Sequence, residues 1–106
     1  MAPRVELLWW DGCPSTPKAL ELVQEALTAE GLDPAAVEMR EVSTSEDAEH
    51  EEFVGSPTIR IDGADVSPPE GEPMGLSCRV YRLRDGRVSP TPDAEDIRDA
   101  IRRTSQ

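Results

Sequence analysis

Apolar residues occupy both alternating faces of one short stretch near the N-terminus, Val5-Glu6-Leu7-Leu8-Trp9-Trp10. A strand with one solvated face alternates apolar and polar residues, whereas a strand covered on both faces reads as a nearly continuous apolar run. Asp11 and Gly12 follow directly and are typical of a turn. The stretch therefore predicts a central strand over residues 5–10.

The chain that follows divides into alternating helical and extended patterns. Three- and four-residue spacing of apolar residues from Pro14 predicts an amphipathic helix that ends at Gly31. Residues 37–42 alternate as a second strand, and Ser43-Thr44-Ser45 supplies N-caps for a short acidic helix that runs to about Phe53. Those carboxylates are expected to form a solvated face, since anions favour a helix N-terminus.

The second half of the chain is predicted to be richer in turns. Residues 58–61 and 64–66 form two strands around the hairpin signal Asp62-Gly63, and an irregular loop over 67–77 follows. A further hairpin spans residues 79–88, and Pro92-Asp93 opens a last helix. The order predicts one α/β domain over residues 1–106, with about three helices on both faces of a mixed, four- to five-stranded sheet.

Composition excludes several classes of function. The 106 residues carry 22 Asp and Glu against 11 Lys and Arg, and the resulting net charge of −11 disfavours nucleic acid as a partner. The longest apolar run, residues 7–10, is too short for a membrane span. Because the N-terminus does not resemble a secretory signal, we expect a cytoplasmic protein with both cysteines reduced.

Cys13 is the strongest candidate for a reactive residue. It follows the predicted strand and precedes Pro14, which suits the first position of a helix. A sulfur at or next to the N-cap would meet unpaired N–H groups, which favour the thiolate over the thiol. The position is normally also partly exposed, so that a reagent can reach the sulfur. Cys13 is therefore expected to be a low-pKa nucleophile.

Two short motifs resemble the active-site loops of thioredoxin-like proteins. They are Trp10-Asp11-Gly12-Cys13-Pro14-Ser15-Thr16, between strand and helix, and Gly55-Ser56-Pro57-Thr58, before the third strand. The resemblance implies a three-layer thioredoxin-like sandwich and a cis peptide bond before Pro57 that faces the cysteine. It also implies a backbone edge for an extended thiol substrate, which would meet Trp10, Pro14, Ser15, Ser56 and Thr58.

The sequence departs from the dithiol members of that family. Thr16 stands where a second cysteine would complete Cys-x-x-Cys, so that no disulfide can form within the motif. A monothiol can still attack a disulfide and be released by an external thiol such as glutathione. The Thr16 hydroxyl either donates a hydrogen bond to the Cys13 thiolate or only caps the helix.

Cys78 leaves two interpretations open. If the hairpin at Asp62-Gly63 returns the chain to the Cys13 end of the sheet, Cys78 can serve as a resolving thiol or as a second ligand for a soft ion. Otherwise Cys78 is a small buried hydrophobic residue.

The sequence is compatible with three functions. The first is a thiol-disulfide oxidoreductase, monothiol or with an atypical pair of cysteines, acting on protein or low-molecular-weight thiols. The second is a protein that binds Hg(II) or Cu(I) through Cys13 and Cys78, and the third is a non-catalytic interaction domain. A structural zinc site fails on the number of ligands, and no other cofactor is expected. The predicted strand over residues 79–83 offers an edge for dimerisation.

Overall fold

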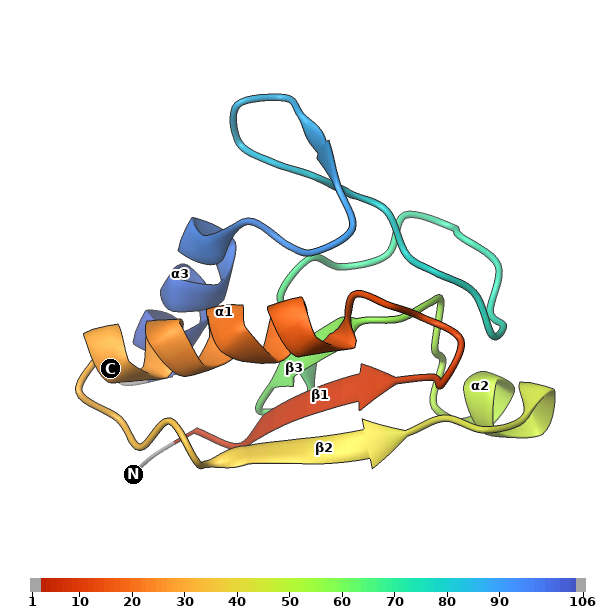
Figure 1. The fold of residues 1–106 in the computed structure, drawn as a ribbon, viewed down its shortest axis with the longest axis horizontal. Helices are drawn as coiled ribbons and strands as arrows, with labels where there is room; N and C mark the ends of the chain where they lie inside the picture. The colour runs from red at the N-terminus through yellow and green to blue at the C-terminus, as the bar shows by residue number, and fades with distance from the viewer. Residues whose placement is uncertain (1–2, 105–106) are drawn as a thin grey trace.

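A computed structural model describes residues 3–104 and places β1 (Val5–Trp9) inside a four-stranded sheet (Figure 1). The strand order is β2-β1-β3-β4, with β2 (Val37–Glu41), β3 (Thr58–Ile61) and β4 (Ala64–Asp65). β1 runs parallel to β2 and antiparallel to β3, and Leu7 lies between Met39 and Ile59. The mixed sheet predicted from the sequence is confirmed.

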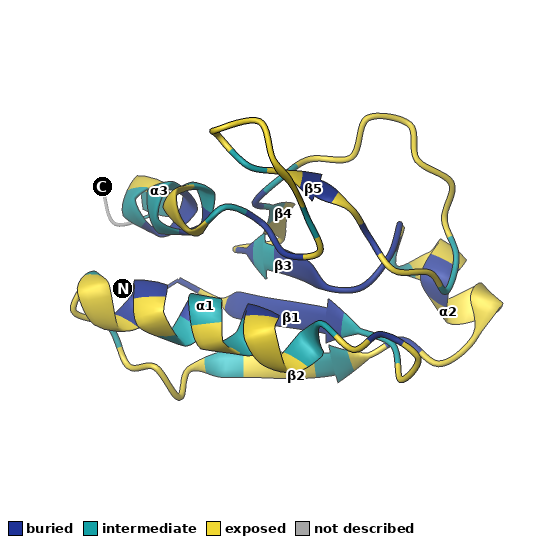
Figure 2. Cartoon of the chain, turned by 45° about the horizontal axis from the view of Figure 1, so that its top comes forward, coloured by how far each residue is buried: buried dark blue, intermediate teal, exposed yellow. Residues whose placement is uncertain are grey.

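Helices α1 (Thr16–Ala29) and α3 (Ala94–Thr104) pack together on one face of this sheet. Their buried residues, including Val23 and Ile97, form one apolar cluster with Leu7 and Ile59. Burial of this cluster explains the apolar spacing of both helices, since side chains three and four residues apart share a helix face. Figure 2 shows the buried residues of β1 next to the inner side of α1.

The opposite face has a smaller apolar core. Leu8, Phe53 and Ala48 of α2 (Ser45–His50) form a second cluster near the end of β1. The Thr44 hydroxyl accepts a hydrogen bond from the Asp47 N–H at 3.0 Å and so caps α2. The helix ends at His50, three residues earlier than predicted, because the chain must turn to bury Phe53.

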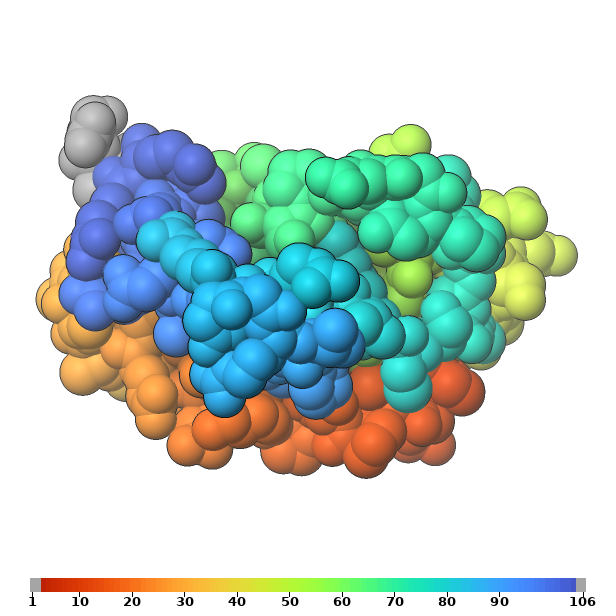
Figure 3. All heavy atoms as spheres, turned by 90° about the horizontal axis from the view of Figure 1, so that it is seen from above, coloured from red at the N-terminus to blue at the C-terminus, as the bar shows by residue number. Residues whose placement is uncertain are grey.

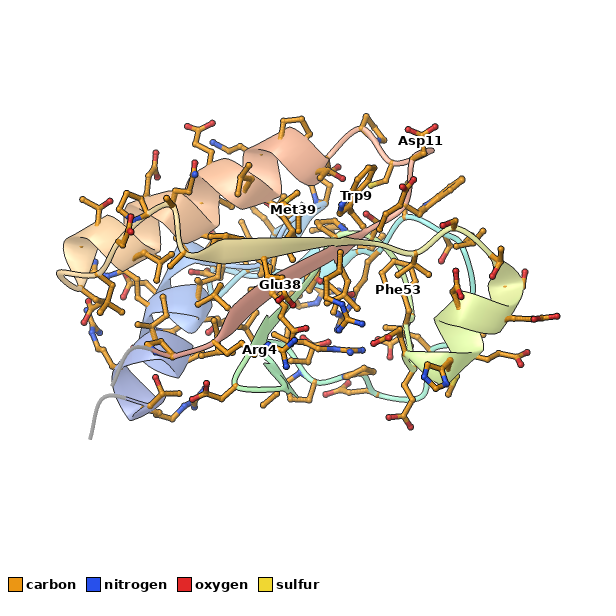
Figure 4. All side chains as sticks on the ribbon, turned by 90° about the horizontal axis from the view of Figure 1, so that it is seen from below. Arg4, Trp9, Asp11, Glu38, Met39 and Phe53 are labelled. Atoms are coloured by element: carbon orange, nitrogen blue, oxygen red, sulfur yellow. The ribbon has the colours of Figure 1, made fainter. Side chains whose placement is uncertain are left out.

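Ion pairs cover the rest of that face in place of a second long helix. Glu6 is 3% exposed and receives Arg40 Nη1 at 2.7 Å, and Arg40 Nη2 lies 2.6 Å from Glu51 Oε2. Figure 4 shows Arg4 next to Glu38 on the same side, and their nearest side-chain atoms are 2.9 Å apart. Helices on both faces are therefore confirmed only in part, since the second layer is short and largely charged.

The second hairpin differs from the prediction. Only β5 (Tyr81–Arg82) and β6 (Val88–Ser89) pair, and they form a separate two-stranded sheet. Before β5, Ser77 and Arg79 are bonded to the backbone of Ser56, and the Arg79 side chain is bonded to Asp65. The expected edge strand over residues 79–83 is thus shortened to two residues. No helix within residues 3–104 is long and apolar enough to cross a membrane.

Candidate functional site

Cys13 lies on the turn that connects β1 to α1. Its N–H donates to the Trp10 carbonyl oxygen at 3.1 Å and closes this turn. A Cβ atom at Gly12 would stand 2.0 Å from the Trp10 indole, so the turn leaves space only for glycine. The sequence predicts a partly exposed thiol, but Cys13 is 7% exposed because other segments cover it.

The first helix begins later than its sequence suggests. Ser15 is the N-cap and Thr16 the first helical residue, with Pro17 in the first turn. Cys13 therefore stands two residues before the N-cap, and the prediction that it occupies or adjoins the cap is wrong. The Ser15 N–H still lowers the pKa of the Cys13 thiol. One backbone donor at the helix start thus favours the thiolate, although the boundary has moved.

The loop before β3 supplies the opposite wall of the site. The Ser56–Pro57 peptide bond is cis, and both residues are fully buried. The Cys13 thiol donates to the Ser56 carbonyl oxygen, with a sulfur–oxygen distance of 3.4 Å. The two motifs that resemble thioredoxin-like loops therefore meet in space.

Cys78 is also at this place, and it is exposed. The two cysteines lie 3.6 Å apart, and each shifts the pKa of the other. Loop 67–77 carries Cys78 there, and Figures 1 and 3 show this part of the chain next to the turn after β1. The interpretation of Cys78 as a small buried residue is wrong, and the return of the chain to the Cys13 end is correct.

Backbone hydrogen bonds fix Cys78 against the Ser56–Pro57 loop. The Ser56 N–H donates to the Ser77 carbonyl oxygen at 2.8 Å, and the Arg79 N–H donates to the Ser56 carbonyl oxygen at 2.8 Å. Cys78 stands between these two bonds, in a single parallel bridge with Ser56. The chain itself therefore occupies the backbone edge that the resemblance implies for an extended substrate.

Arg79 anchors this segment through its buried side chain. The guanidinium lies 2.7 Å from Asp65 Oδ2 and 3.2 Å from Thr58 Oγ1, and it also donates to the Ser67 carbonyl oxygen. It stacks over the Tyr81 ring at 4.6 Å from the ring centroid. The Arg79 side chain therefore connects β3, β4 and the start of loop 67–77. No sequence pattern singles out Arg79, because its partners are distant along the chain.

The surroundings of the two sulfurs shift their pKa values in opposite directions. Burial by itself would raise the pKa of Cys13, but hydrogen bonds from the Ser15 N–H, the Ser56 and Cys78 side chains and the Ser15 hydroxyl outweigh it, so the pKa lies below its ordinary value. The hydrogen bond with Cys13, burial and the Cys13 charge all raise the pKa of Cys78. Of the two thiols, Cys13 is therefore the one that loses its proton first.

The remaining predicted site residues take other positions. Thr16 Oγ1 and Ser56 Oγ are both buried without a hydrogen-bond partner, and of these two hydroxyls only that of Ser56 lowers the pKa of Cys13. Trp10 packs against the second apolar cluster and its Nε1 is also unpartnered. Thr58 is buried, and its hydroxyl donates to the Gly55 carbonyl oxygen at 2.6 Å. Pro14 is exposed beside the turn.

The cysteine pair lies apart from the cleft beneath loop 67–77. Within residues 3–104 no three His, Cys, Asp or Glu side chains are grouped closely enough to hold a metal ion. The cleft of about 430 Å³ beneath loop 67–77 contains neither cysteine and has charges of both signs, from Arg60, Asp65 and Glu72. The two thiols are therefore the reactive groups around which the site is built.

Replacing Ser56 by Ala is expected to raise the pKa of Cys13, because one group that favours the thiolate is lost. Only the thiolate reacts with iodoacetamide, so the curve of Cys13 alkylation against pH shifts to higher pH. The rate is followed by mass spectrometry of the tryptic peptide 5–18. Ser43→Ala, at an exposed serine, is the control. Equal midpoints for Ser56→Ala and the unmodified protein would contradict this assignment.

Replacing Arg79 by Met is expected to destabilise the fold by about 3–5 kcal/mol, because Asp65 keeps a charge without its partner. Arg84→Met is the matched control, since the Arg84 side chain is 50% exposed and pairs with Asp96 and Asp99 at the surface. That change is expected to cost less than about 1 kcal/mol. Urea unfolding measures both values, and a similar loss for the two variants would refute a special role for Arg79.

No protein-family model, no curated protein and no solved structure matches the chain. The conclusion about function accordingly rests on the two cysteines and the groups around them.

Proposed function

We propose that the chain is a thiol-disulfide redox protein with a thioredoxin-like fold, in which Cys13 and Cys78 form the reacting pair. The element order, the cis peptide bond and the position of Cys13 at the end of β1 support the family resemblance. The meeting of both cysteines at the Ser56–Pro57 loop carries the proposal. It favours the form with two cysteines over the monothiol form.

The Cys13 thiolate is the more easily formed nucleophile of the pair. Once a substrate thiol has formed a mixed disulfide with one cysteine, the other cysteine attacks that cysteine's sulfur, an S–S bond forms between Cys13 and Cys78, and the substrate leaves as a thiolate. The protein loses two electrons and the substrate disulfide gains them. A low-molecular-weight thiol such as glutathione returns the pair to the dithiol. A reducing cytoplasm would supply such a thiol.

Mild oxidation in a glutathione buffer tests this function. The protein is expected to lose two hydrogens and form a Cys13–Cys78 disulfide within one chain, seen as linked peptides 5–18 and 61–79. Cys13→Ser and Cys78→Ser should stop at mixed disulfides with glutathione. The function is refuted if the unmodified protein gives only mixed disulfides or linked dimers.

The same two thiols support a second candidate, the binding of a soft ion such as Hg(II) or Cu(I). Thiolates are the ligands that such ions prefer, and the site offers two of them, with no third His, Cys, Asp or Glu grouped with them in the described part of the chain, residues 3–104. A two-coordinate ion fits this donor set better than zinc, which takes four ligands.

Titration with Hg(II) is expected to show one ion per chain, and both Cys13→Ser and Cys78→Ser should weaken binding sharply. Ser89→Ala, outside the cysteine pair, serves as the control. Equal binding by the protein and its Cys78→Ser variant would exclude the paired site. If neither disulfide nor ion forms in the native protein, the interaction domain is the surviving hypothesis.

A further inference from the structure

We infer that an external thiol enters the exchange at Cys78, and that Cys13 is the sulfur that leaves, with the external partner being a low-molecular-weight thiol. This inference rests on the proposed redox function and adds the order of the two sulfurs. It reverses the order expected from the sequence, in which the substrate meets Cys13 first.

Access to the two sulfurs differs. Cys13 is 7% exposed and lies under the Ser56 carbonyl group, whereas Cys78 is exposed on the outer side of the pair. Thiol-disulfide exchange requires the attacking sulfur to reach the attacked one. A thiol from solution therefore meets Cys78 before it can reach Cys13.

The partner's size follows from the backbone of Ser56. Its N–H and carbonyl groups are both taken by Ser77 and Arg79, so no free edge remains there for an extended peptide to pair with. The buried Arg79 guanidinium, held by Asp65, Thr58 and Ser67, opposes displacement of the segment. A small thiol needs only the exposed Cys78 sulfur and no backbone edge.

The chemistry balances along this route. One external thiolate attacks the Cys78 sulfur of the disulfide, the bond to Cys13 breaks, and Cys13 leaves as a thiolate. A second external thiolate attacks the external sulfur of the mixed disulfide, which frees Cys78 and gives an external disulfide. The Cys78 thiolate then takes up a proton, and two electrons have passed from the external thiols to the protein.

The electrostatics favour the same order. A thiol of lower pKa is the better leaving group, and the pKa of Cys13 lies below its ordinary value while that of Cys78 lies above. Attack on Cys13 would instead expel Cys78, the poorer leaving group. By microscopic reversibility, oxidation of the dithiol by the same partner also passes through a mixed disulfide on Cys78.

Peptide mapping of the oxidised protein tests the order. The protein with its Cys13–Cys78 disulfide is mixed with glutathione, quenched in acid within seconds, and labelled with N-ethylmaleimide before digestion with trypsin. Glutathione is expected on peptide 61–79 and the label on peptide 5–18, by about tenfold over the reverse. In the urea-unfolded control, where both sulfurs are equally reachable, this preference should be lost. Glutathione mainly on peptide 5–18 of the folded protein would overturn the inference.

Single-cysteine variants decide the order if the mixed disulfide converts back to the Cys13–Cys78 disulfide too quickly to be trapped. The reaction of Cys13→Ser and Cys78→Ser with 5,5′-dithiobis(2-nitrobenzoate) is followed against pH, where the midpoint reports ionisation and the plateau reports access. We expect Cys13 to have the lower midpoint and also a plateau about tenfold lower. A Cys13 plateau equal to or above that of Cys78 would overturn the order of entry.

A cysteine-centred pentapeptide tests the partner class, and it is expected to react with the oxidised protein no faster than glutathione does. A tenfold advantage for the pentapeptide, after correction for thiol pKa, would overturn the low-molecular-weight assignment. Failure to form the Cys13–Cys78 disulfide at all refutes the proposed function, whereas a disulfide that opens at Cys13 refutes only this inference.

Discussion

The buried guanidinium of Arg79 is the contact on which the arrangement of the site depends. It neutralises Asp65 at the end of β4, donates to Thr58 at the start of β3, and holds the first residue of loop 67–77. A buried charge is costly unless it is paired and its donors are satisfied, and here both conditions are met. Residues 77–79, with Cys78 among them, are consequently anchored against the sheet.

The sheet provides the other half of the site. β1 is buried along most of its length between β2 and β3, so its end is fixed relative to the start of β3. The turn with Cys13 follows the end of β1, and the Ser56–Pro57 loop precedes the start of β3. A rigid sheet therefore positions two loops that are not adjacent in sequence, which is how irregular segments acquire defined geometry.

The sequence alone was sufficient for the elements whose signals are local. The apolar stretch over residues 5–10, the Asp62-Gly63 turn and the apolar face of α1 all predicted structure that is present. Predictions that depended on distant contacts were less accurate. The start of α1, the separate β5–β6 hairpin and the burial of Cys13 are set by segments far away along the chain, and the Arg79 ion pair has no local signature at all. Trp9 and Trp10 illustrate the same limit, because a short apolar strand does not reveal what will cover each indole.

The position of Arg79 also depends on Gly55, a residue without a side chain. A Cβ atom built there would lie 3.0 Å from the Arg79 Cβ and 3.1 Å from its backbone nitrogen, and the glycine has φ +139, which other residues rarely adopt. Any larger residue would push Arg79 outward, and Cys78 is bonded directly to Arg79. The spacing of the two sulfurs is thus governed in part by a single hydrogen atom, so that a methyl group placed outside the reactive centre would alter its chemistry by geometry alone.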